Sequence, residues 1–277
     1  MRVRFLDVDG INTRYYVSGE GKSGTPLLLI HGVGSSGDIF IRCIDQLAVD
    51  RPVYALDLVG HGFADMVDFG DRPPQRVQLD QLFGFMKALG VKRYIPAGSS
   101  FGGLLAALMY FERPQEVEKL ILIGTGSTFN PADDQVPVLQ AVLKNQINAA
   151  SDPTPETIRP RNAGSTYEKG DTFEEIVFTQ LTSYALPGRA MALKQTVEGL
   201  IATVDSKEYR VVERLEGIKC PTLIITGRED IRAPWKNVIA GHERIAGSVL
   251  HIFEKCGHKP FAEHAEAFVE KVLHFLK

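Results

Sequence analysis

Short runs of apolar, often β-branched residues alternate with segments of helical periodicity along most of the chain. Residues 2–8 and 12–19, joined by Asp9-Gly10, predict an opening hairpin. Further strands are predicted at 25–32, 51–58, 92–98, 117–124, 220–227 and 248–253. Helices are predicted at 38–50, 75–89, 101–112, 235–246 and 260–276. A hairpin followed by alternating strands and helices predicts an α/β fold with a mostly parallel sheet and helices on both faces.

One region interrupts this alternation. Between residues 125 and 217 no strand-like run occurs, while helical patterns and loop residues do. We therefore expect residues 1–124 and 218–277 to form the core of the fold. We expect residues 125–217 to form a helical insertion that sits on the sheet as a cap, not an independent domain.

Composition and charge exclude several classes of protein. Lys and Arg number 31 and Asp and Glu 34, a net charge of −3, and there is no basic run. This balance argues against nucleic acid or an anionic membrane as a partner. The chain has neither an apolar stretch long enough to span a bilayer nor the apolar segment of a signal peptide near its start. Its three cysteines lack metal-ligand or disulfide spacing, so we expect free thiols and a cytoplasmic location.

Residues 97–103, AGSSFGG, place two serines at the junction of a predicted strand and a predicted helix. An immediate strand-to-helix turn needs small residues two positions before and two positions after its central residue, the G-x-S-x-G pattern. Ser100 has Gly98 and Gly102 at these positions, whereas Ser99 would have Ala97 and Phe101. Ser100 is therefore the candidate nucleophile, the alternative being a tight turn without chemistry.

A serine hydroxyl needs a general base that a third group orients. Asp230 follows the strand at 220–227, and His258 follows the strand at 248–253, beside Gly257. Both lie beyond the carboxyl ends of strands, where a parallel sheet collects its functional loops. Glu229 is the alternative acid, less favoured by its offset from Gly227, and the remaining six histidines lie in predicted strands, helices or glycine-rich loops.

The loop after the strand at 25–32 supplies a candidate oxyanion hole. Its glycines let the backbone approach a reacting carbonyl, and the amide after the nucleophile, that of Phe101, is the second donor. The Val33 amide is the natural donor from this loop, whose other residues of interest are His31, Gly32 and Gly34.

These motifs together resemble the α/β-hydrolase superfamily over essentially the whole chain. The motifs are HGVG (31–34), DLVGHG (57–62), GSSFGG (98–103), GREDIRAP (227–234) and CGHKPFAE (256–263). The resemblance implies a sheet of about eight strands, a helical lid, and a Ser100–His258–Asp230 triad. It implies no metal or organic cofactor, and no cluster of ligand residues in the sequence suggests one.

Two branches of the superfamily fit. Lid-bearing carboxylesterases fit every motif, and hydrolases that cleave carbon–carbon bonds in ring-fission products are similar at the carboxyl terminus and in TPETIRP. The latter usually carry Asn where this chain has Ser99, Trp where it has Lys259, and a longer glycine-rich loop. These departures favour ester hydrolysis, with carbon–carbon hydrolysis as the alternative and a ligand-binding receptor as a third reading.

The predicted substrate is a small-molecule ester or a similar acyl compound. Phe129 in the insertion is a candidate for the pocket wall, although packing in the core is the favoured interpretation, and Trp235 beyond Asp230 could line the pocket rim or pack under a helix. The same choice applies to Tyr167, Phe173, Phe178 and Tyr184. A solvated surface is the favoured reading of three arginines that could otherwise recognise a substrate carboxylate: Arg159, Arg161 and Arg189.

Overall fold

Eight strands form one sheet in the computed structural model, which describes residues 1–277. The strand order is β1-β2-β4-β3-β5-β6-β7-β8. β1 pairs antiparallel with β2 and β2 with β4, and all other neighbours are parallel, which confirms the predicted fold class. The strands are β1 (Arg2–Val8), β2 (Ile11–Ser18), β3 (Leu27–Ile30), β4 (Val53–Leu56), β5 (Ile95–Ser99), β6 (Leu120–Ile123), β7 (Thr222–Gly227) and β8 (Val249–Phe253).

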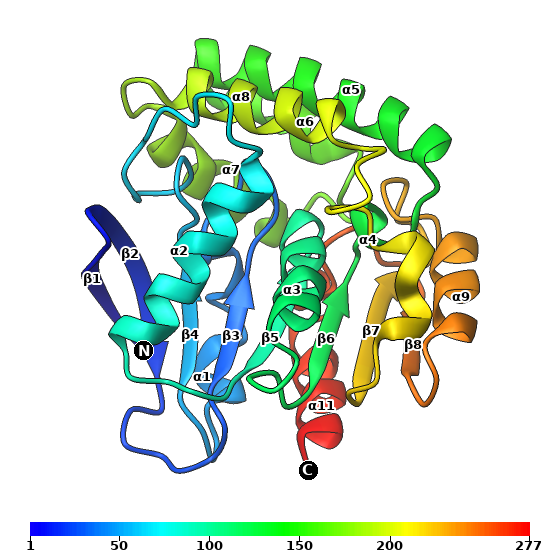
Figure 1. The fold of residues 1–277 in the computed structure, drawn as a ribbon. Coiled ribbons are helices and arrows are strands. Elements are labelled where there is room, and N and C mark those ends of the chain that lie inside the picture. Colours follow the sequence, from blue (N-terminus) through cyan, green and yellow to red (C-terminus); the bar gives the residue numbers. More distant parts are fainter.

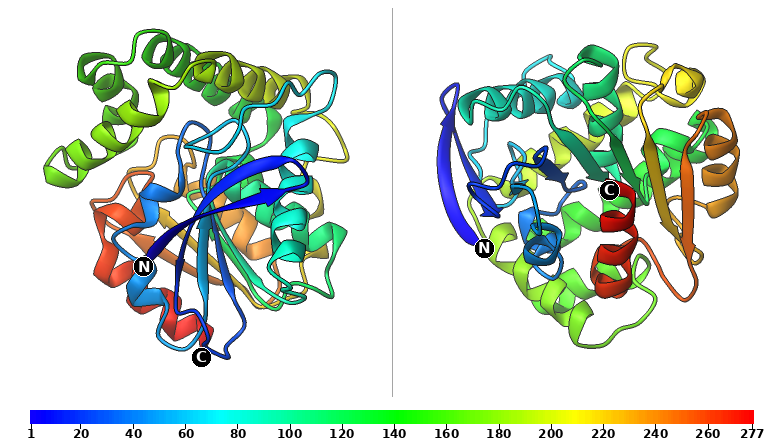
Figure 2. Two further views of the ribbon diagram at one scale, coloured as in Figure 1. Left: turned by 90° about the vertical axis from the view of Figure 1, so that its left-hand side faces the viewer. Right: turned by 90° about the horizontal axis from the view of Figure 1, so that it is seen from below.

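Helices cover both faces of the sheet (Figures 1 and 2). α2 (Pro74–Ala88), α3 (Phe101–Glu112) and α9 (Trp235–Arg244) pack on one face. α1 (Ile44–Leu47) and α11 (Ala265–Leu276) pack on the other. The central sheet is therefore buried on both sides, as its parallel strands require.

The strand sequences explain this two-sided burial. All four residues of β3 are apolar and buried. Because successive side chains of a strand point to opposite faces, Leu28 and Ile30 join the hydrophobic cluster of α2 and α3, while Leu27 and Leu29 join that of α1 and α11. A continuous apolar run, not an alternating one, is therefore the signature of these strands.

The helical insertion spans residues 125–217, and its helices between residues 132 and 202 lie above the carboxyl ends of the parallel strands (Figure 1). Part of it has its own small core, which includes Ile158, Phe173 and Val177. Leu139 and Val197 instead belong to the main core, so the insertion packs directly on the sheet domain. Its helices are α4 (Gly126–Phe129), α5 (Ala132–Ser151), α6 (Pro155–Ala163), α7 (Asp171–Tyr184) and α8 (Arg189–Ala202), followed by the 3-10 helix η2 (Val212–Gly217).

The continuous helix predicted over 38–50 is wrong. The segment contains the 3-10 helix η1 (Gly37–Phe40) and the single turn of α1. A Cβ on Gly37 would lie only 2.8 Å from the Ala55 carbonyl oxygen, so the chain passes directly against β4 there. Phe40 and Leu47 are fully buried. The helix-like spacing of apolar residues in this segment therefore arises because a short connection packs against the core, not because the segment is one helix.

The helix predicted over 260–276 is interrupted at His264. α10 (Pro260–Glu263) ends there and α11 begins at the next residue, because His264 has a non-helical φ of −132°. The His264 ring stacks on Phe253 with centroids 5.4 Å apart, and its Nε2 lies 3.1 Å from the Lys255 carbonyl oxygen. These contacts anchor the loop that carries His258. The expectation that His264 lies inside a helix is therefore wrong.

The helices include no membrane-spanning segment, and the cysteines form no disulfide bond. None of the helices combines the length and the apolar character needed to cross a bilayer. All three cysteines are unpaired, and Cys43 and Cys256 are buried.

Candidate active site

Ser100 occupies the turn between β5 and α3. Its backbone has φ 56° and ψ −121°, a conformation that side-chain-bearing residues rarely adopt. The Ser100 N–H donates to the Ile123 carbonyl at 2.9 Å, and its own carbonyl accepts from Gly103 at 2.9 Å. The turn is thus fixed by hydrogen bonds to β6 and to the first turn of α3.

The positions around Ser100 require glycine, because neighbouring backbone segments pass so close that a Cβ atom would not fit. A Cβ on Gly98 would overlap the Gly102 carbonyl oxygen, and one on Gly102 would overlap that of Ile30. A Cβ on Gly32 would lie 2.8 Å from the Ser100 Cβ. The G-x-S-x-G spacing therefore corresponds to real steric limits, with Ser100 at the centre of the turn. Ser99, the last residue of β5, is buried.

His258 and Asp230 form a buried pair. The His258 Nδ1 donates to Asp230 Oδ2 at 2.7 Å, and Asp230 Oδ1 accepts from the amides of Arg232 and Ala233 at 2.8 and 3.1 Å. Burial alone would raise the pKa of Asp230, but His258 and these amides outweigh it and hold the pKa below its ordinary value of 3.8. The carboxylate is therefore ionised and can orient the imidazole.

The remaining nitrogen of His258 is available. His258 Nε2 is buried and has no hydrogen-bond partner, and His258 and Ser100 line the same two cavities. The alternative acid, Glu229, is engaged elsewhere: its Oε2 accepts from the Cys256 amide at 2.8 Å. A serine, an imidazole and an orienting carboxylate in this arrangement are the groups that nucleophilic acyl transfer requires.

His31 fixes the start of the candidate oxyanion loop through two hydrogen bonds of its ring. Its Nε2 accepts from the Leu58 amide at 3.0 Å, which places the ring proton on Nδ1, and Nδ1 donates to the Gly32 carbonyl at 2.8 Å. Complete burial lowers the pKa of His31, so the ring is neutral. The Val33 N–H has no acceptor within the protein, and the Phe101 N–H lies in the first turn of α3, where helical amides lack partners.

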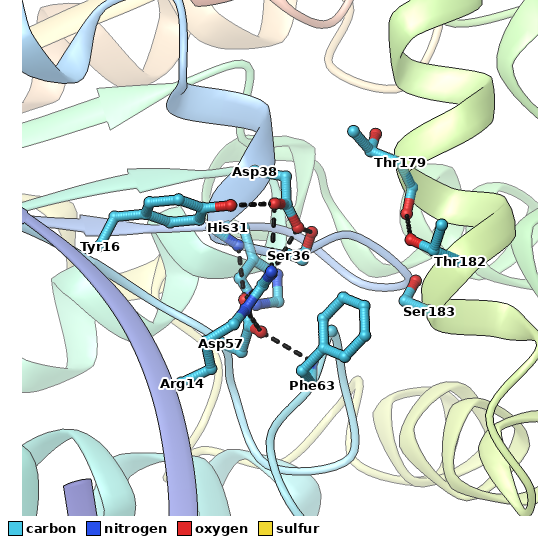
Figure 3. A network of polar contacts seen from close by, with 12 residues as sticks. Arg14, Tyr16, His31, Ser36, Asp38, Asp57, Phe63, Thr179, Thr182 and Ser183 are labelled. Carbon is cyan, nitrogen blue, oxygen red and sulfur yellow. Dashed lines mark hydrogen bonds and ion pairs between the residues drawn. The ribbon is translucent and has the colours of Figure 1, made fainter. Parts of the chain in front are cut away.

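A buried ion network supports the same loop (Figure 3). Arg14 Nε donates to Asp57 Oδ2 at 2.6 Å, and Arg14 also pairs with Asp38. Asp57 accepts from the amides of Gly37 and Phe63 at 2.8 and 2.7 Å. Sequence reasoning placed Asp57 in a motif but missed Arg14 and Asp38. An arginine directly before the aromatic and apolar residues Tyr15, Tyr16 and Val17 of a predicted strand was the signal that could have found Arg14.

Two cavities flank Ser100. One, of about 30 Å³, is walled in part by apolar side chains of α5 and α8, namely Val138, Leu139, Val142 and Leu200, and Gln135 and Arg232 also line it. The other, also of about 30 Å³, is polar, and Ser99 is part of its wall. Its charged and amide-bearing side chains are Arg161, Gln180, Arg232 and Lys259.

The polar cavity concentrates positive charge. Arg161 and Lys259 are buried, Arg232 is half-buried, and none of the three forms an ion pair with a carboxylate. Burial, together with repulsion from Arg161, lowers the pKa of Arg232 to about 10 and that of Lys259 well below its ordinary value. Lys259 Nζ donates to three neutral oxygens, those of Asn162, Ser165 and Thr166. Buried cations without counter-ions make a favourable place for an anionic ligand group.

The structure corrects the reading of the arginines. Arg161 is 4% and Arg189 1% exposed, so neither belongs to a solvated surface. Arg189 donates to the Gly62 and Ala64 carbonyls. Arg159 does lie on the surface, where it pairs with Glu174.

Neither candidate wall residue lines the cavities beside Ser100. Phe129 is buried in the core, where its ring fills the space next to Gly241. Trp235 begins α9, and the Arg228 guanidinium lies over its ring at 4.4 Å. Among the other aromatic residues of the insertion, Phe173 and Tyr184 are buried, and Tyr167 and Phe178 are exposed.

Comparison with known proteins identifies the class to which this fold and site belong. The sequence profile described as the alpha/beta hydrolase family matches residues 27–271. The chain therefore belongs to the alpha/beta hydrolase family, as its motifs predicted.

Its relatives include hydrolases of one named activity. The 2-hydroxy-6-oxononadienedioate/2-hydroxy-6-oxononatrienedioate hydrolase of Burkholderia vietnamiensis is 31% identical over 280 residues, covering 97% of this chain and 93% of its own. A hydrolase of the same name from Pseudomonas putida is 29% identical over 282 residues, covering 100% and 95%.

Solved structures share the fold. The 2-hydroxy-6-oxo-6-phenylhexa-2,4-dienoate hydrolase of Rhodococcus sp. strain RHA1 matches with a TM-score of 0.82 and 20% identity, covering 99% of both chains. An esterase of Exiguobacterium antarcticum matches with a TM-score of 0.80 and 20% identity, covering 98% of both. At this identity the likeness concerns the fold alone. The sequence relatives are named as dienedioate hydrolases and not as esterases, which agrees better with the alternative drawn from the motifs than with the favoured ester hydrolysis.

Proposed function

We propose that this hydrolase cleaves a carbon–carbon bond next to the ketone of a ring-fission dienoate, using Ser100, His258 and Asp230. The observation that carries the proposal is the set of buried, unpaired cations beside Ser100 (Arg161, Lys259 and the half-buried Arg232). A neutral ester gives such a site nothing to neutralise, whereas a dienoate brings a carboxylate.

The names of the relatives support the same reaction class. A 2-hydroxy-6-oxononadienedioate has two carboxylates, an enol and a ketone but no ester. Water can therefore split such a molecule only at a carbon–carbon bond. Because this chain aligns with the Burkholderia vietnamiensis hydrolase over 97% of its length, we extend that chemistry to it.

In the proposed reaction the Ser100 hydroxyl adds to the ketone carbon while His258 Nε2 takes its proton. The negative charge that develops on the ketone oxygen is bound by the amides of Val33 and Phe101. The carbon–carbon bond then breaks, and the departing dienoate fragment takes the electron pair and the proton that His258 Nε2 received from Ser100. Water, deprotonated by His258, releases the acyl group from Ser100 as a carboxylic acid.

The two cavities suggest how the substrate is oriented. The polar cavity suits the departing dienoate fragment, whose carboxylate faces the three cations. The apolar wall of the other cavity, formed by Val138, Leu139, Val142 and Leu200, suits an uncharged acyl fragment. The named relatives act on dioates, so this chain is expected to prefer a less charged acyl end than theirs.

Ester hydrolysis is the second candidate, because the same groups perform it. Ser99 and Lys259 favour it, since ring-fission hydrolases usually carry Asn and Trp at these positions. In that case the polar cavity would receive the alcohol part of the ester.

A substrate panel tests the proposal. Purified protein would be given a 2-hydroxy-6-oxo-6-alkylhexadienoate and p-nitrophenyl esters of increasing acyl length, with Ser100→Ala as the matched inactive control. We expect loss of the dienoate absorbance and formation of two acids, both abolished by Ser100→Ala. Ester turnover without dienoate turnover would contradict carbon–carbon cleavage, and tight binding without any turnover would indicate a receptor.

A further inference from the structure

The helical insertion holds the candidate oxyanion loop through a convergent set of hydrogen bonds. Two carbonyls of this loop, those of Val33 and Gly34, accept from side chains of three helices: α5, α6 and α7. The bonds to Val33 O come from Gln146 Nε2 and an Arg161 guanidinium nitrogen, both at 3.1 Å. The bonds to Gly34 O come from the same Arg161 nitrogen at 3.1 Å, Gln180 Nε2 at 3.2 Å and the Tyr184 hydroxyl at 2.8 Å.

These donors are buried and are in direct contact with the loop. Gln146, Gln180 and Tyr184 are each no more than 3% exposed. Gly34 has a φ of +67°, and a Cβ there would overlap Gln146 and lie 2.5 Å from the Tyr184 hydroxyl. The insertion contacts the loop directly at these two carbonyls, so the side chains replace solvent as their hydrogen-bond partners.

The contacts act on the two peptide groups that flank the Val33 Cα. On one side, His31 fixes the Gly32–Val33 peptide through its bond to the Gly32 carbonyl. On the other side, Gln146 and Arg161 fix the Val33–Gly34 peptide through the Val33 carbonyl. A peptide group is planar, so the bond from His31 to the Gly32 carbonyl sets the direction of the Val33 N–H. The bonds to the Val33 carbonyl fix the next peptide plane, which limits rotation about the two backbone bonds of the Val33 Cα. The sheet domain and the insertion therefore each hold one side of Val33.

We propose that Tyr184 and Gln146 are positioning residues, which align the Val33 N–H for the oxyanion by holding the loop carbonyls. The helical insertion then completes the oxyanion hole as well as enclosing the substrate. This inference goes beyond the proposed bond specificity, since carbon–carbon and ester cleavage both pass through an oxyanion. Gln180 contributes to the same set but also lines the polar cavity, so it is unsuited to a test.

The test uses Tyr184→Phe and Gln146→Leu, each of which removes hydrogen-bonding atoms while keeping most of the side-chain volume. Ser183→Ala is the matched control, because the Ser183 hydroxyl is buried on the same helix and bonds only to the Gln180 carbonyl. Removing an oxyanion donor itself lowers kcat by roughly 100- to 1000-fold. Loss of a positioning contact is expected to lower kcat roughly tenfold, with KM within about twofold of the wild type.

A transition-state mimic separates positioning from structural support. The Ser100 oxygen bonds to the boron of an alkyl boronic acid, and the Ser100 proton passes to His258. The resulting tetrahedral boronate carries a negative charge, as the oxyanion does. Its affinity should weaken by the same factor as kcat/KM in both variants, while the affinity for the carboxylic acid product stays unchanged. Ser183→Ala should change neither.

Two outcomes would overturn the proposal. One is wild-type boronate affinity in folded Tyr184→Phe and Gln146→Leu. The other is an equal loss of boronate and product affinity, which a general disturbance of the cavity would produce. Because boronate binding needs no turnover, the result stands even if the dienoate proves not to be the substrate.

Discussion

Ser100, the candidate nucleophile, has a strained backbone conformation. Its φ of 56° and ψ of −121° are adopted freely only by glycine. Such a conformation costs a side-chain-bearing residue about 1–3 kcal/mol and persists where the surrounding structure enforces it.

The strain gives the first prediction. Ser100→Gly should abolish turnover and raise the free energy of unfolding by about 1 kcal/mol, because glycine relieves the strain but has a more flexible unfolded state. Urea denaturation of wild type, Ser100→Gly and Ser100→Ala would measure it. Equal stability of the Gly and Ala variants would contradict the assignment of strain to this residue.

Lys259 supplies a second prediction for single residues. Lys259→Met should raise KM for a dienoate roughly tenfold, because the substrate carboxylate loses a charge-assisted interaction in a buried site. The kcat/KM for an uncharged p-nitrophenyl ester should change less than about twofold, and Lys259→Arg should restore part of the dienoate affinity. Equal losses for both substrates would show that Lys259 only supports the fold.

The candidate catalytic residues were predictable because their signals are local. Ser100, Asp230 and His258 each follow a recognisable strand at a fixed offset. Arg161 and Arg189 were not, since their burial depends on helices of the insertion docking on loops more than 100 residues away. A solvent-exposed position is the reasonable prediction for an arginine in a polar helix such as α6. Only the tertiary contacts of the folded protein show that Arg161 is buried.

At the scale of elements, the loops at the sheet edge depend on the Arg14–Asp57 ion pair. Both side chains are almost completely buried, and Asp57 also accepts from the Gly37 and Phe63 amides. The network therefore ties β2 to the loops after β3 and β4 (Figure 3).

Breaking this pair should be costly. Asp57→Asn is expected to lower the free energy of unfolding by about 3 kcal/mol, because it leaves the Arg14 charge buried with weakened compensation. The control is Glu254→Gln, which removes an ion pair with Arg228 on the surface and should leave the urea midpoint unchanged. Similar midpoints for both variants would exclude a structural role for the buried network.

Sequence periodicity predicted most elements but misplaced those shaped by their neighbours. α3 matches its predicted range of 101–112, because a helix with apolar residues on all sides is buried wherever it packs. The segment 38–50 shows a helical spacing of apolar residues yet contains only short turns. Contact between Gly37 and β4 decides its course, and such contact leaves no mark on local periodicity.

At the scale of the whole molecule, two buried histidines couple stability to pH. The rings of His31 and His61 lie 5.4 Å apart, and burial lowers the pKa of both below the ordinary value of 6.5. The unfolded chain therefore binds more protons than the folded protein below that value. Stability is fully present above pH 6.5 and is lost as the pH falls towards the lowered pKa values.

Denaturation at two pH values tests this coupling. The free energy of unfolding should fall between about pH 7 and about pH 5.5, by at most about 1.4 kcal/mol per pH unit for each histidine. His61→Asn should show a smaller fall, even if it is less stable at neutral pH. The same pH dependence in wild type and His61→Asn would rule out this source.

The overall architecture was predictable, whereas the assembly of the site was not. Alternation of strands and helices, interrupted by a helical stretch, was sufficient to predict the sheet and the insertion above it. The contacts of Gln146, Arg161 and Tyr184 with the candidate oxyanion loop join segments 113 to 150 residues apart. Such pairings follow from the packed fold and carry no signal in a single sequence.

A competition experiment tests the central claim most directly. Equal concentrations of a 2-hydroxy-6-oxo-6-alkylhexadienoate and a p-nitrophenyl ester of matching acyl length would be mixed with the enzyme. The ratio of initial product rates then gives the ratio of the two kcat/KM values. We predict a ratio of at least about tenfold in favour of the dienoate, with both products absent for Ser100→Ala. Preferential cleavage of the ester would contradict the account.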